Sequence, residues 1–403
     1  MPAINLEALH YYLSYRHIPS PLTIFKGIYT KSPIDLSNLK FSPVCSLPEE
    51  KIVDKLDKLL REAIKKRLSG SVGFLTSGGI DSGIVTAIAS QLSNNPIKTF
   101  SLTYDEESET KGKRLDREYA HWISEIYKTN HHEEIISFNH ISEKLPNILK
   151  CIGQPFSGYV SNYFISRFVK RYVDIVLTGD WGDELFGSYK AHRLAYQNPS
   201  VKPWRIRYSL LVFNDEEKKE LYSKQTYKVV CKYSTLQHLK KYFCKLTAED
   251  SLNKMLESEF RSFFPDHALM AIEKLSKAYS LKVKSPYSDP KFLEFATKIP
   301  GRLKMKNGTP KYLLKQLALR YLPKEIVYRK KEGFVTPTFP LVKKLEEYIK
   351  KILTPEKLNK HEFFNIDYVQ ELLENFYRNG DESQAYKIWN LVSFQVWYEL
   401  YMK

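Results

Sequence analysis

Residues 72–93 read VGFLTSGGIDSGIVTAIASQLS and carry the clearest secondary-structure pattern in the chain. The run Val72–Thr76 is short and nearly all apolar, which is typical of a strand covered on both faces of a parallel sheet. A turn with two glycines, SGGIDS at 77–82, follows this strand, and the apolar run after the turn predicts a helix. A strand, a glycine turn and a helix in succession indicate the first unit of an α/β fold.

Three more strands alternate with helices on the C-terminal side of this unit. The strands are predicted in KTFSLTY at 98–104, HHEEIIS at 131–137 and DIVLTGD at 174–180, with helices over 115–128 and around 140–150 and 160–172. This alternation predicts an α/β fold with a doubly wound, mainly parallel sheet, whose core spans about residues 70–190. Beyond residue 190 helical patterns dominate, so we expect a mainly helical C-terminal cover over about 191–403.

The first 48 residues contain five prolines between positions 19 and 48, separated by brief apolar runs. We therefore expect a linker-like, irregular segment over 1–48. At Glu49 an amphipathic helical pattern begins, with apolar residues recurring at the 3.6-residue period. The domain is expected to span 49–403.

Composition narrows the class of protein. The 403 residues carry a formal net charge of +16. The four cysteines are scattered along the chain, which excludes a disulfide scaffold or a zinc ribbon. We see neither a signal peptide nor an apolar run long enough to cross a membrane, so we expect a cytoplasmic location and no membrane partner. Because the lysines are spread among acidic residues, the positive charge is typical of a solvated surface, although an anionic partner is compatible with it.

The SGGIDS turn has the properties of an anion cradle. Gly78 and Gly79 allow a tight turn that points N–H groups at a phosphate, and the helix after the turn adds its positive dipole end. Ser77 and Ser82 can donate hydroxyl hydrogen bonds. Asp81 would repel a phosphate unless Mg²⁺ lies between them, so the turn predicts a phosphate site with a magnesium ion. The chain lacks the GxxxxGK[ST] pattern, which disfavours a kinase or an ordinary ATPase.

A second polar turn, TGDWGDELFGSY at 178–189, follows the strand at 174–180. Ligands bind at the carboxyl ends of parallel strands, so Asp183 could share a Mg²⁺ with Asp81. Alone, such a turn could equally hold solvated acids. The two turns together make the prediction specific.

These motifs resemble the synthetase domain of glutamine-dependent asparagine synthetases, in the PP-loop ATP pyrophosphatase superfamily (adenine nucleotide alpha hydrolase-like). Two later blocks strengthen the resemblance, the first at 265–300 and the second, GTPKYLLKQLALRYLPKEIVYRKKEGFVTP, at 308–337. The resemblance covers nearly the whole chain. It implies a ligase that uses ATP and Mg²⁺ to adenylate a small carboxylate such as aspartate, releases pyrophosphate, and then lets ammonia or an amine displace AMP to give an amide.

The resemblance also implies roles for particular residues. Asp180 would stand near the activated carboxylate, and Lys331 would stabilise negative charge during both steps. Lys311 is a weaker candidate for a phosphate contact, since a lysine in a lysine-rich chain is equally compatible with a surface position. The remaining residues fall into groups for pyrophosphate and metal (Ser77, Gly78, Gly79, Asp81, Ser82, with Asp183 as second metal carboxylate) and for adenosine (Leu75, Leu102, Thr178, Gly179).

Several features depart from the family pattern. Family members of the common type begin with a glutaminase domain whose cysteine stands at position 2, whereas this chain has Pro2 and no cysteine before Cys45. We therefore expect nitrogen from free ammonium, from a separate glutaminase subunit or from an amine substrate. Trp181 and Lys282 replace the family's usual residues and leave aspartate open as the substrate.

Three alternatives remain open from the sequence. The chain could form an intramolecular or peptide amide, as β-lactam synthetases and lasso-peptide cyclases do. It could instead be an RNA-modifying PP-loop enzyme, which its charge would suit, although we see no RNA-binding module and expect no nucleic-acid partner. The third alternative is an inactive relative that serves as a binding subunit, which the intact Asp81, Asp183 and Lys331 disfavour.

Overall fold

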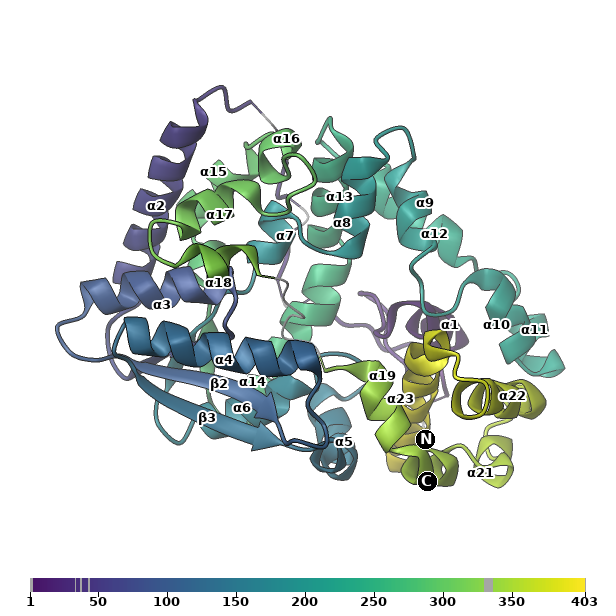
Figure 1. Ribbon diagram of the computed structural model, residues 1–403. Helices are drawn as coiled ribbons and strands as arrows, with labels where there is room; N and C mark the ends of the chain where they lie inside the picture. Colours follow the sequence, from purple (N-terminus) through teal and green to yellow (C-terminus); the bar gives the residue numbers. More distant parts are fainter. Residues whose placement is uncertain (1–2, 33, 37, 43, 330–335, 403) are drawn as a thin grey trace.

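A computed structural model describes residues 3–32, 34–36, 38–42, 44–329 and 336–402 (Figure 1). Its centre is a five-stranded sheet in the order β3-β2-β1-β4-β5, and every neighbouring pair is parallel. The strands are β1 (Val72–Leu75), β2 (Lys98–Tyr104), β3 (Asn130–Ile136), β4 (Ile175–Leu177) and β5 (Lys282–Lys284). The predicted α/β fold with a parallel sheet is confirmed.

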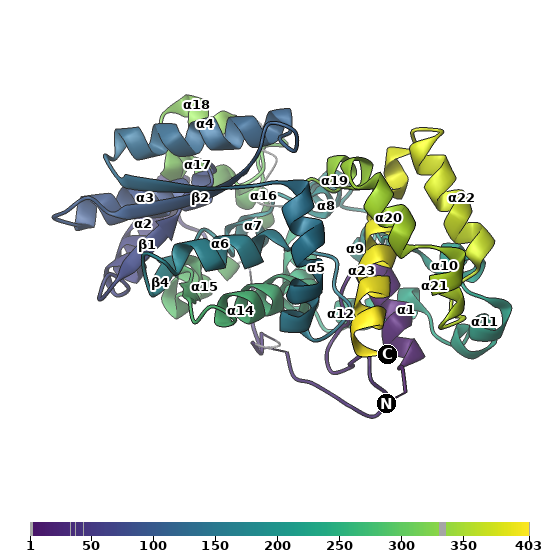
Figure 2. The ribbon, with the colours of Figure 1, turned by 90° about the horizontal axis from the view of Figure 1, so that it is seen from below.

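Helices cover both faces of the sheet, as the apolar strands require. On one face α3 (Ile80–Leu92) and α4 (Lys111–Ile126) lie against the strands, with α2 (Glu49–Lys65) and α17 (Tyr312–Ala318) packed on α3; on the other face lies α6 (Ser161–Val169). Figure 2 shows α4 and α6 on opposite sides of β2. In β4 the side chains alternate between the two cores: Val176 joins the α6 side and Leu177 the α3 side. The sheet is therefore doubly wound.

The rest of the described chain is helical. Between the strands lies α5 (Phe138–Ile152), and after β4 come α7 (Gly182–Phe186), α8 (Lys190–Gln197), α9 (Pro203–Tyr208), α10 (Asp215–Leu221), α11 (Lys224–Val230), α12 (Thr235–Phe243), α13 (Ser251–Phe260), a π-helix (Phe264–Leu269) and α14 (Met270–Lys277). Beyond β5 and a 3₁₀ turn (Pro286–Ser288) come α15 (Pro290–Thr297), α16 (Gly301–Lys304), α18 (Lys324–Tyr328), α19 (Thr338–Lys344), α20 (Glu346–Ile352), α21 (Pro355–Asn359), α22 (Ile366–Tyr377), a second 3₁₀ turn (Glu382–Gln384) and α23 (Ala385–Tyr401). No described helix is both long and apolar enough to cross a membrane.

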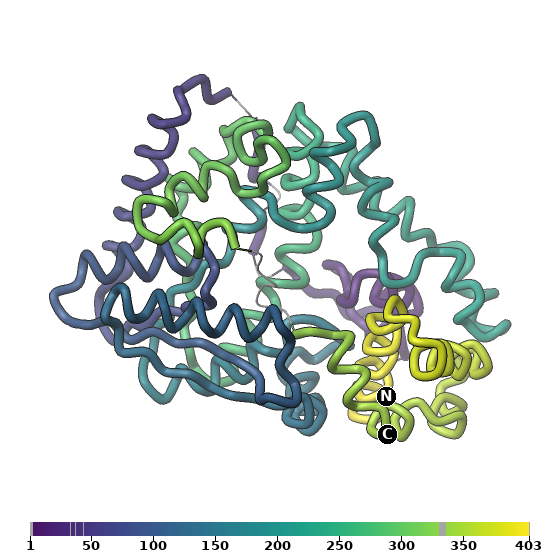
Figure 3. Tube along the Cα trace, viewed as in Figure 1, coloured from purple at the N-terminus to yellow at the C-terminus, as the bar shows by residue number. Residues whose placement is uncertain are grey.

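The segment before Glu49 is less irregular than its prolines suggest. Residues Leu6–Tyr15 form a helix, α1, whose first turn is capped by the Asn5 side chain. Figure 3 shows α1 beside the C-terminal part of the chain, where it packs on α11, α12 and α23. The Tyr12 hydroxyl donates a 2.7 Å hydrogen bond to the Asn390 carbonyl, and the Asn390 side-chain amide donates to the Leu13 carbonyl at 2.9 Å. The expectation of an irregular segment was wrong over these residues, because the five prolines between positions 19 and 48 all lie beyond α1. The boundary at 48/49 stays a prediction.

Strand β5 lies within the part of the chain that was expected to be mainly helical. Its three residues pair with β4, with Val283 opposite Val176. Lys282 and Lys284 are exposed on either side of the half-buried Val283. A three-residue strand with two lysines has no apolar run that a sequence pattern could detect. The strand becomes recognisable only from its pairing with β4 at the edge of the sheet.

Candidate active site

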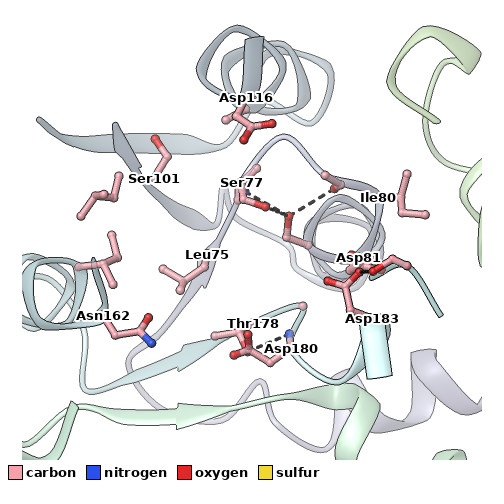
Figure 4. A pocket seen from close by; sticks show the side chains of 18 of the residues that line it. Leu75, Ser77, Ile80, Asp81, Ser101, Asp116, Asn162, Thr178, Asp180 and Asp183 are labelled. Atoms are coloured by element: carbon pink, nitrogen blue, oxygen red, sulfur yellow. Dashed lines mark hydrogen bonds between the residues drawn. The ribbon is translucent and has the colours of Figure 1, made fainter. Parts of the chain in front are cut away.

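The site lies where the sheet changes direction. Strand β1 pairs with β2 on one side and with β4 on the other, so the connections after β1 and β4 leave in opposite directions and open a crevice between them. A cavity of about 790 Å³ occupies this crevice. Figure 4 shows Leu75, Ser77 and Asp81 from the β1 side facing Thr178, Asp180 and Asp183 from the β4 side.

The SGGIDS turn is held in a shape that exposes its backbone. Gly78 has a φ of +69°, and a Cβ there would lie 2.4 Å from the Asp116 carbonyl oxygen, so only glycine fits. The Ser82 hydroxyl oxygen accepts a 3.1 Å hydrogen bond from the Ser77 N–H and lies 3.0 Å from the Ser77 hydroxyl. Helix α3 begins at Ile80 and runs for 13 residues, which places its N-terminal amides at the turn.

Arg329 fastens this turn from outside. Its Nε donates a 2.9 Å hydrogen bond to the Gly78 carbonyl, and its guanidinium pairs with Asp116 at 2.6 Å. The guanidinium carbon also lies 4.8 Å from the centre of the Tyr119 ring. Sequence reasoning cited Arg329 only as part of a family block; its contact to the glycine turn depends on tertiary packing between segments 251 residues apart.

Asp81 and Asp183 converge on one cation. The Lys311 ammonium lies 2.6 Å from Asp81 Oδ2 and also contacts Asp183 Oδ1. Lys311 is 3% exposed, so a surface position for this lysine is excluded. Its backbone is left-handed, with a φ of +54°. Two carboxylates from the first turns of α3 and α7, which follow β1 and β4, thus share the positive charge of Lys311, and the predicted metal role of both stays a prediction.

The donor set suits Mg²⁺ held partly by a substrate. No group of three or more His, Cys, Asp or Glu side chains that could hold a metal occurs among the residues described. Mg²⁺ commonly takes one or two carboxylates and completes its shell with water and phosphate oxygens. Gly182 leaves room for the carboxylate, because a Cβ at this position would lie 2.7 Å from Asp81 Oδ1.

The turn after β4 holds Asp180 in place. The Thr178 hydroxyl donates a 2.6 Å hydrogen bond to Asp180 Oδ2, and the Ser285 hydroxyl donates to the Asp180 carbonyl at 2.7 Å. Burial raises the pKa of Asp180, and the hydrogen bond from Thr178 opposes this shift. Asp180 lies half-buried at the cavity wall, with these two hydrogen bonds fixing its side chain and its backbone.

Trp181 adopts a left-handed backbone conformation with a φ of +77°, which is rare for a bulky residue. Its side chain is buried, with its ring 5.0 Å from Phe264 and 5.6 Å from Phe260, centre to centre. Trp181 thus packs behind the cavity wall that Phe264 lines. Its bulk therefore supports the cavity wall from behind.

A further pair in the same turn was not singled out from the sequence. The Tyr189 hydroxyl donates a 2.6 Å hydrogen bond to Glu184 Oε1. Burial and the charge of Asp183 raise the pKa of Glu184 to about 8. The spacing of five residues within one turn is the only sequence signal for this pair.

A buried network behind the turn supports Asp183. The Ser188 hydroxyl donates to Asp183, and the Ser188 and Tyr189 N–H groups donate to His192 Nδ1 at 3.1 and 3.3 Å. His192 is fully buried, and burial lowers its pKa to about 3, so the ring is neutral and can accept these bonds. Sequence reasoning missed this network because its members are not arranged in any motif.

The predicted adenosine residues lie in the same cavity. Leu75, Leu102, Thr178 and Gly179 line it together with apolar residues of α6 such as Ile165. The structure thus brings together every predicted site residue that it describes, with Gly78 contributing the shape of the turn. Lys331 lies outside the described residues.

Fold and site together define a parallel α/β protein with a polar ligand site at the switch point of its sheet. Comparison with known proteins places it more closely: the family model named Asparagine synthase matches residues 55–399. The chain belongs to the asparagine synthase family, and is thereby an ATP-dependent ligase that forms amide bonds.

Curated relatives agree over nearly the whole chain. Asparagine synthetase [glutamine-hydrolyzing] 1 of Bacillus subtilis is 26% identical, with 98% of this chain and 69% of the relative covered. Asparagine synthetase [glutamine-hydrolyzing] 3 of the same organism is 24% identical, with 94% and 67% covered. Among solved structures, NMN synthetase from Francisella tularensis matches 36% of this chain and 60% of its own at 16% identity and a TM-score of 0.25, too distant a likeness to support an argument.

Proposed function

We propose that this protein adenylates a small carboxylate, in the simplest case aspartate, and converts it to an amide. The substrate carboxylate attacks the α-phosphorus of ATP, the bond to the β,γ-pyrophosphate breaks, and an acyl-adenylate forms. Ammonia or an amine then attacks the acyl carbon, and AMP leaves. The observation that carries the proposal is the Asp81–Lys311–Asp183 cluster beside the SGGIDS turn.

The turn would hold the pyrophosphate that leaves. Its backbone N–H groups and the amino end of α3 offer partial positive charge without any movement. Asp81 and Asp183 would hold Mg²⁺, which neutralises charge on the phosphates when bound. Lys311, which now pairs with both carboxylates, would then be able to contact a phosphate oxygen.

Two further residues would act at the carboxylate. Asp180 follows β4 and precedes Asp183 in the same turn. Its raised pKa suits a group that takes a proton from the attacking amine. Lys331 is proposed as the cation that stabilises the charge developing on the acyl oxygen. Removing such a group costs about a hundredfold to a thousandfold in rate.

The test is product analysis with purified protein, MgATP and aspartate. We expect AMP and pyrophosphate in equal amounts, and asparagine when ammonium is supplied; ADP and phosphate would contradict the proposed cleavage. Parallel reactions with ammonium, with glutamine and without a nitrogen source identify the donor, since glutamine would serve only with a glutaminase subunit present.

A matched pair of variants separates chemistry from folding. Asp81→Asn should abolish pyrophosphate release, whereas Asp54→Asn removes a half-exposed carboxylate on α2 and should leave turnover unchanged. Turnover by Asp81→Asn near the unmodified rate would refute the metal role. Folded protein that consumes no ATP with aspartate, but does so with a peptide acid, would favour an intramolecular or peptide amide former.

A further inference from the structure

Helix α6 turns one face toward the cavity. Asn162, Ile165, Ser166 and Val169 line the cavity, and their spacing along α6 puts them on a single helical face. Ile165 and Val169 belong to the core that α6 shares with the sheet. The strand residues of this core that also line the cavity are all apolar, namely Leu75, Phe100, Leu102, Val176 and Val283. Walls of this kind suit an uncharged part of a ligand.

The Asn162 amide is a polar group in this apolar setting. The side chain is 9% exposed, and its amide forms no hydrogen bond with the described part of the chain. Figure 4 shows the amide pointing into the cavity, on the side of Leu75 and Thr178. Buried polar groups in proteins are nearly always hydrogen-bonded, so an amide in this position indicates a ligand that supplies the missing bonds. The Ser166 hydroxyl, one helical turn away and 3% exposed, likewise has no hydrogen-bond partner among the described residues.

The SGGIDS turn and Asn162 lie on opposite sides of Leu75. In Figure 4 the turn lies beyond Leu75 as seen from Asn162, at the amino end of α3. A triphosphate held at this turn would place the base of ATP on the α6 side of the cavity. There the apolar walls match the faces of a purine ring, and the Asn162 amide matches its polar edge.

We propose that the Asn162 amide hydrogen-bonds the edge of the adenine base that carries the amino group, so that the protein selects ATP over purine nucleotides without this group. The proposal rests on the use of ATP in the proposed function above. A side-chain amide offers an acceptor oxygen beside an NH₂ donor, and the adenine edge offers an NH₂ donor beside a ring-nitrogen acceptor. The two groups are therefore complementary. A purine without the amino group leaves the amide oxygen unpaired in a buried site.

Nucleotide binding in the absence of an acid substrate tests the proposal. Purine riboside triphosphate differs from ATP only in lacking the amino group, and isothermal titration calorimetry with Mg²⁺ measures Kd for each nucleotide. We expect the unmodified protein to bind ATP about tenfold more tightly, since an unpaired buried amide weakens binding. Asn162→Leu keeps nearly the same volume. It should raise Kd for ATP about tenfold and change Kd for purine riboside triphosphate by less than about twofold. Asn139→Leu makes the same change at an exposed position of α5 outside the cavity and is the matched control.

The possible results separate this proposal from the proposed function. Equal Kd values for the two nucleotides in the unmodified protein would overturn the role of Asn162, as would unchanged ATP binding in Asn162→Leu. Either result leaves AMP formation from an acid intact. Discrimination between the nucleotides by a protein that forms AMP with no acid would support the role of Asn162 and refute the proposed function. Absence of binding of both nucleotides would overturn both. Circular dichroism shows whether each variant is folded, and the comparison on the unmodified protein decides the proposal if Asn162→Leu does not fold.

Discussion

Replacing Lys311 by methionine should destabilise the protein and at the same time make Mg²⁺ a stronger stabiliser. The substitution keeps most of the side-chain volume and removes the ammonium that Asp81 and Asp183 share. Breaking a buried ion pair costs about 3–5 kcal/mol, because a carboxylate stays buried without its partner. Asp183 is partly exposed, so we expect a loss near the lower end, about 3 kcal/mol.

Mg²⁺ can replace the lost charge. In the unmodified protein the ion must displace Lys311, whereas in Lys311→Met the two carboxylates are ready to receive it. At a concentration of about 100 times Kd, a ligand stabilises the folded state by about 2.7 kcal/mol, so Mg²⁺ should restore most of the loss in the variant and add less to the unmodified protein.

Urea unfolding with and without Mg²⁺ measures both effects. Lys306→Met is the control, since Lys306 forms a more exposed ion pair with Glu49 at 2.6 Å and should cost less than about 1 kcal/mol. A loss in Lys311→Met as small as in the control, or equal stabilisation of both proteins by Mg²⁺, would refute the shared-charge reasoning.

Three other substitutions test the site and the fold. Gly78→Ala places a Cβ 2.4 Å from the Asp116 carbonyl oxygen at a φ of +69°, so it should cost about 1–3 kcal/mol and weaken ATP binding; ATP binding as tight as in the unmodified protein would contradict the turn geometry. His192→Ala removes the acceptor for the Ser188 N–H and should raise the Mg²⁺ concentration needed for half-maximal pyrophosphate release several-fold, with an unchanged requirement as the contrary result. Burial lowers the pKa of His131 from 6.5 to about 4, so only the unfolded state takes up this proton as the pH falls from 6.5 to 4. Stability should then fall by up to about 1.4 kcal/mol per pH unit, and His131→Asn should make the denaturation curves less pH-dependent; an identical slope would show that this histidine does not contribute.

The carboxylates at the site could be predicted because local pattern and topology agree. Asp81 and Asp183 each follow a short apolar strand, and in a parallel sheet such positions meet at one edge. What the pattern could not give is the strand order, which puts β4 beside β1 although β2 and β3 intervene in sequence. Because β1 and β4 are neighbours in the sheet, the loops that follow them form one site.

The position of Lys311 could not be read from the sequence. Lys311 is one of many lysines, and its left-handed backbone conformation is not marked by a glycine in the sequence. Its partner Asp81 lies 230 residues earlier. Helix α1 was missed for a related reason: it is buried on nearly all sides, so it lacks the polar face by which amphipathic helices are found. In both cases tertiary packing determines the position or the helix, and tertiary packing cannot be derived from local patterns in a single sequence.

The pairing of α1 with α23 has a consequence for how this protein is made. The hydrogen bond from Tyr12 to Asn390 joins residues 378 positions apart, so α1 can make this contact only after α23 has been synthesised. Helices α11 and α12 can cover part of α1 earlier, but the apolar surface that faces α23 has no native partner until then, and contacts of such long range form slowly. During synthesis this part of α1 therefore stays exposed to non-native contacts until residues 385–401 have been made.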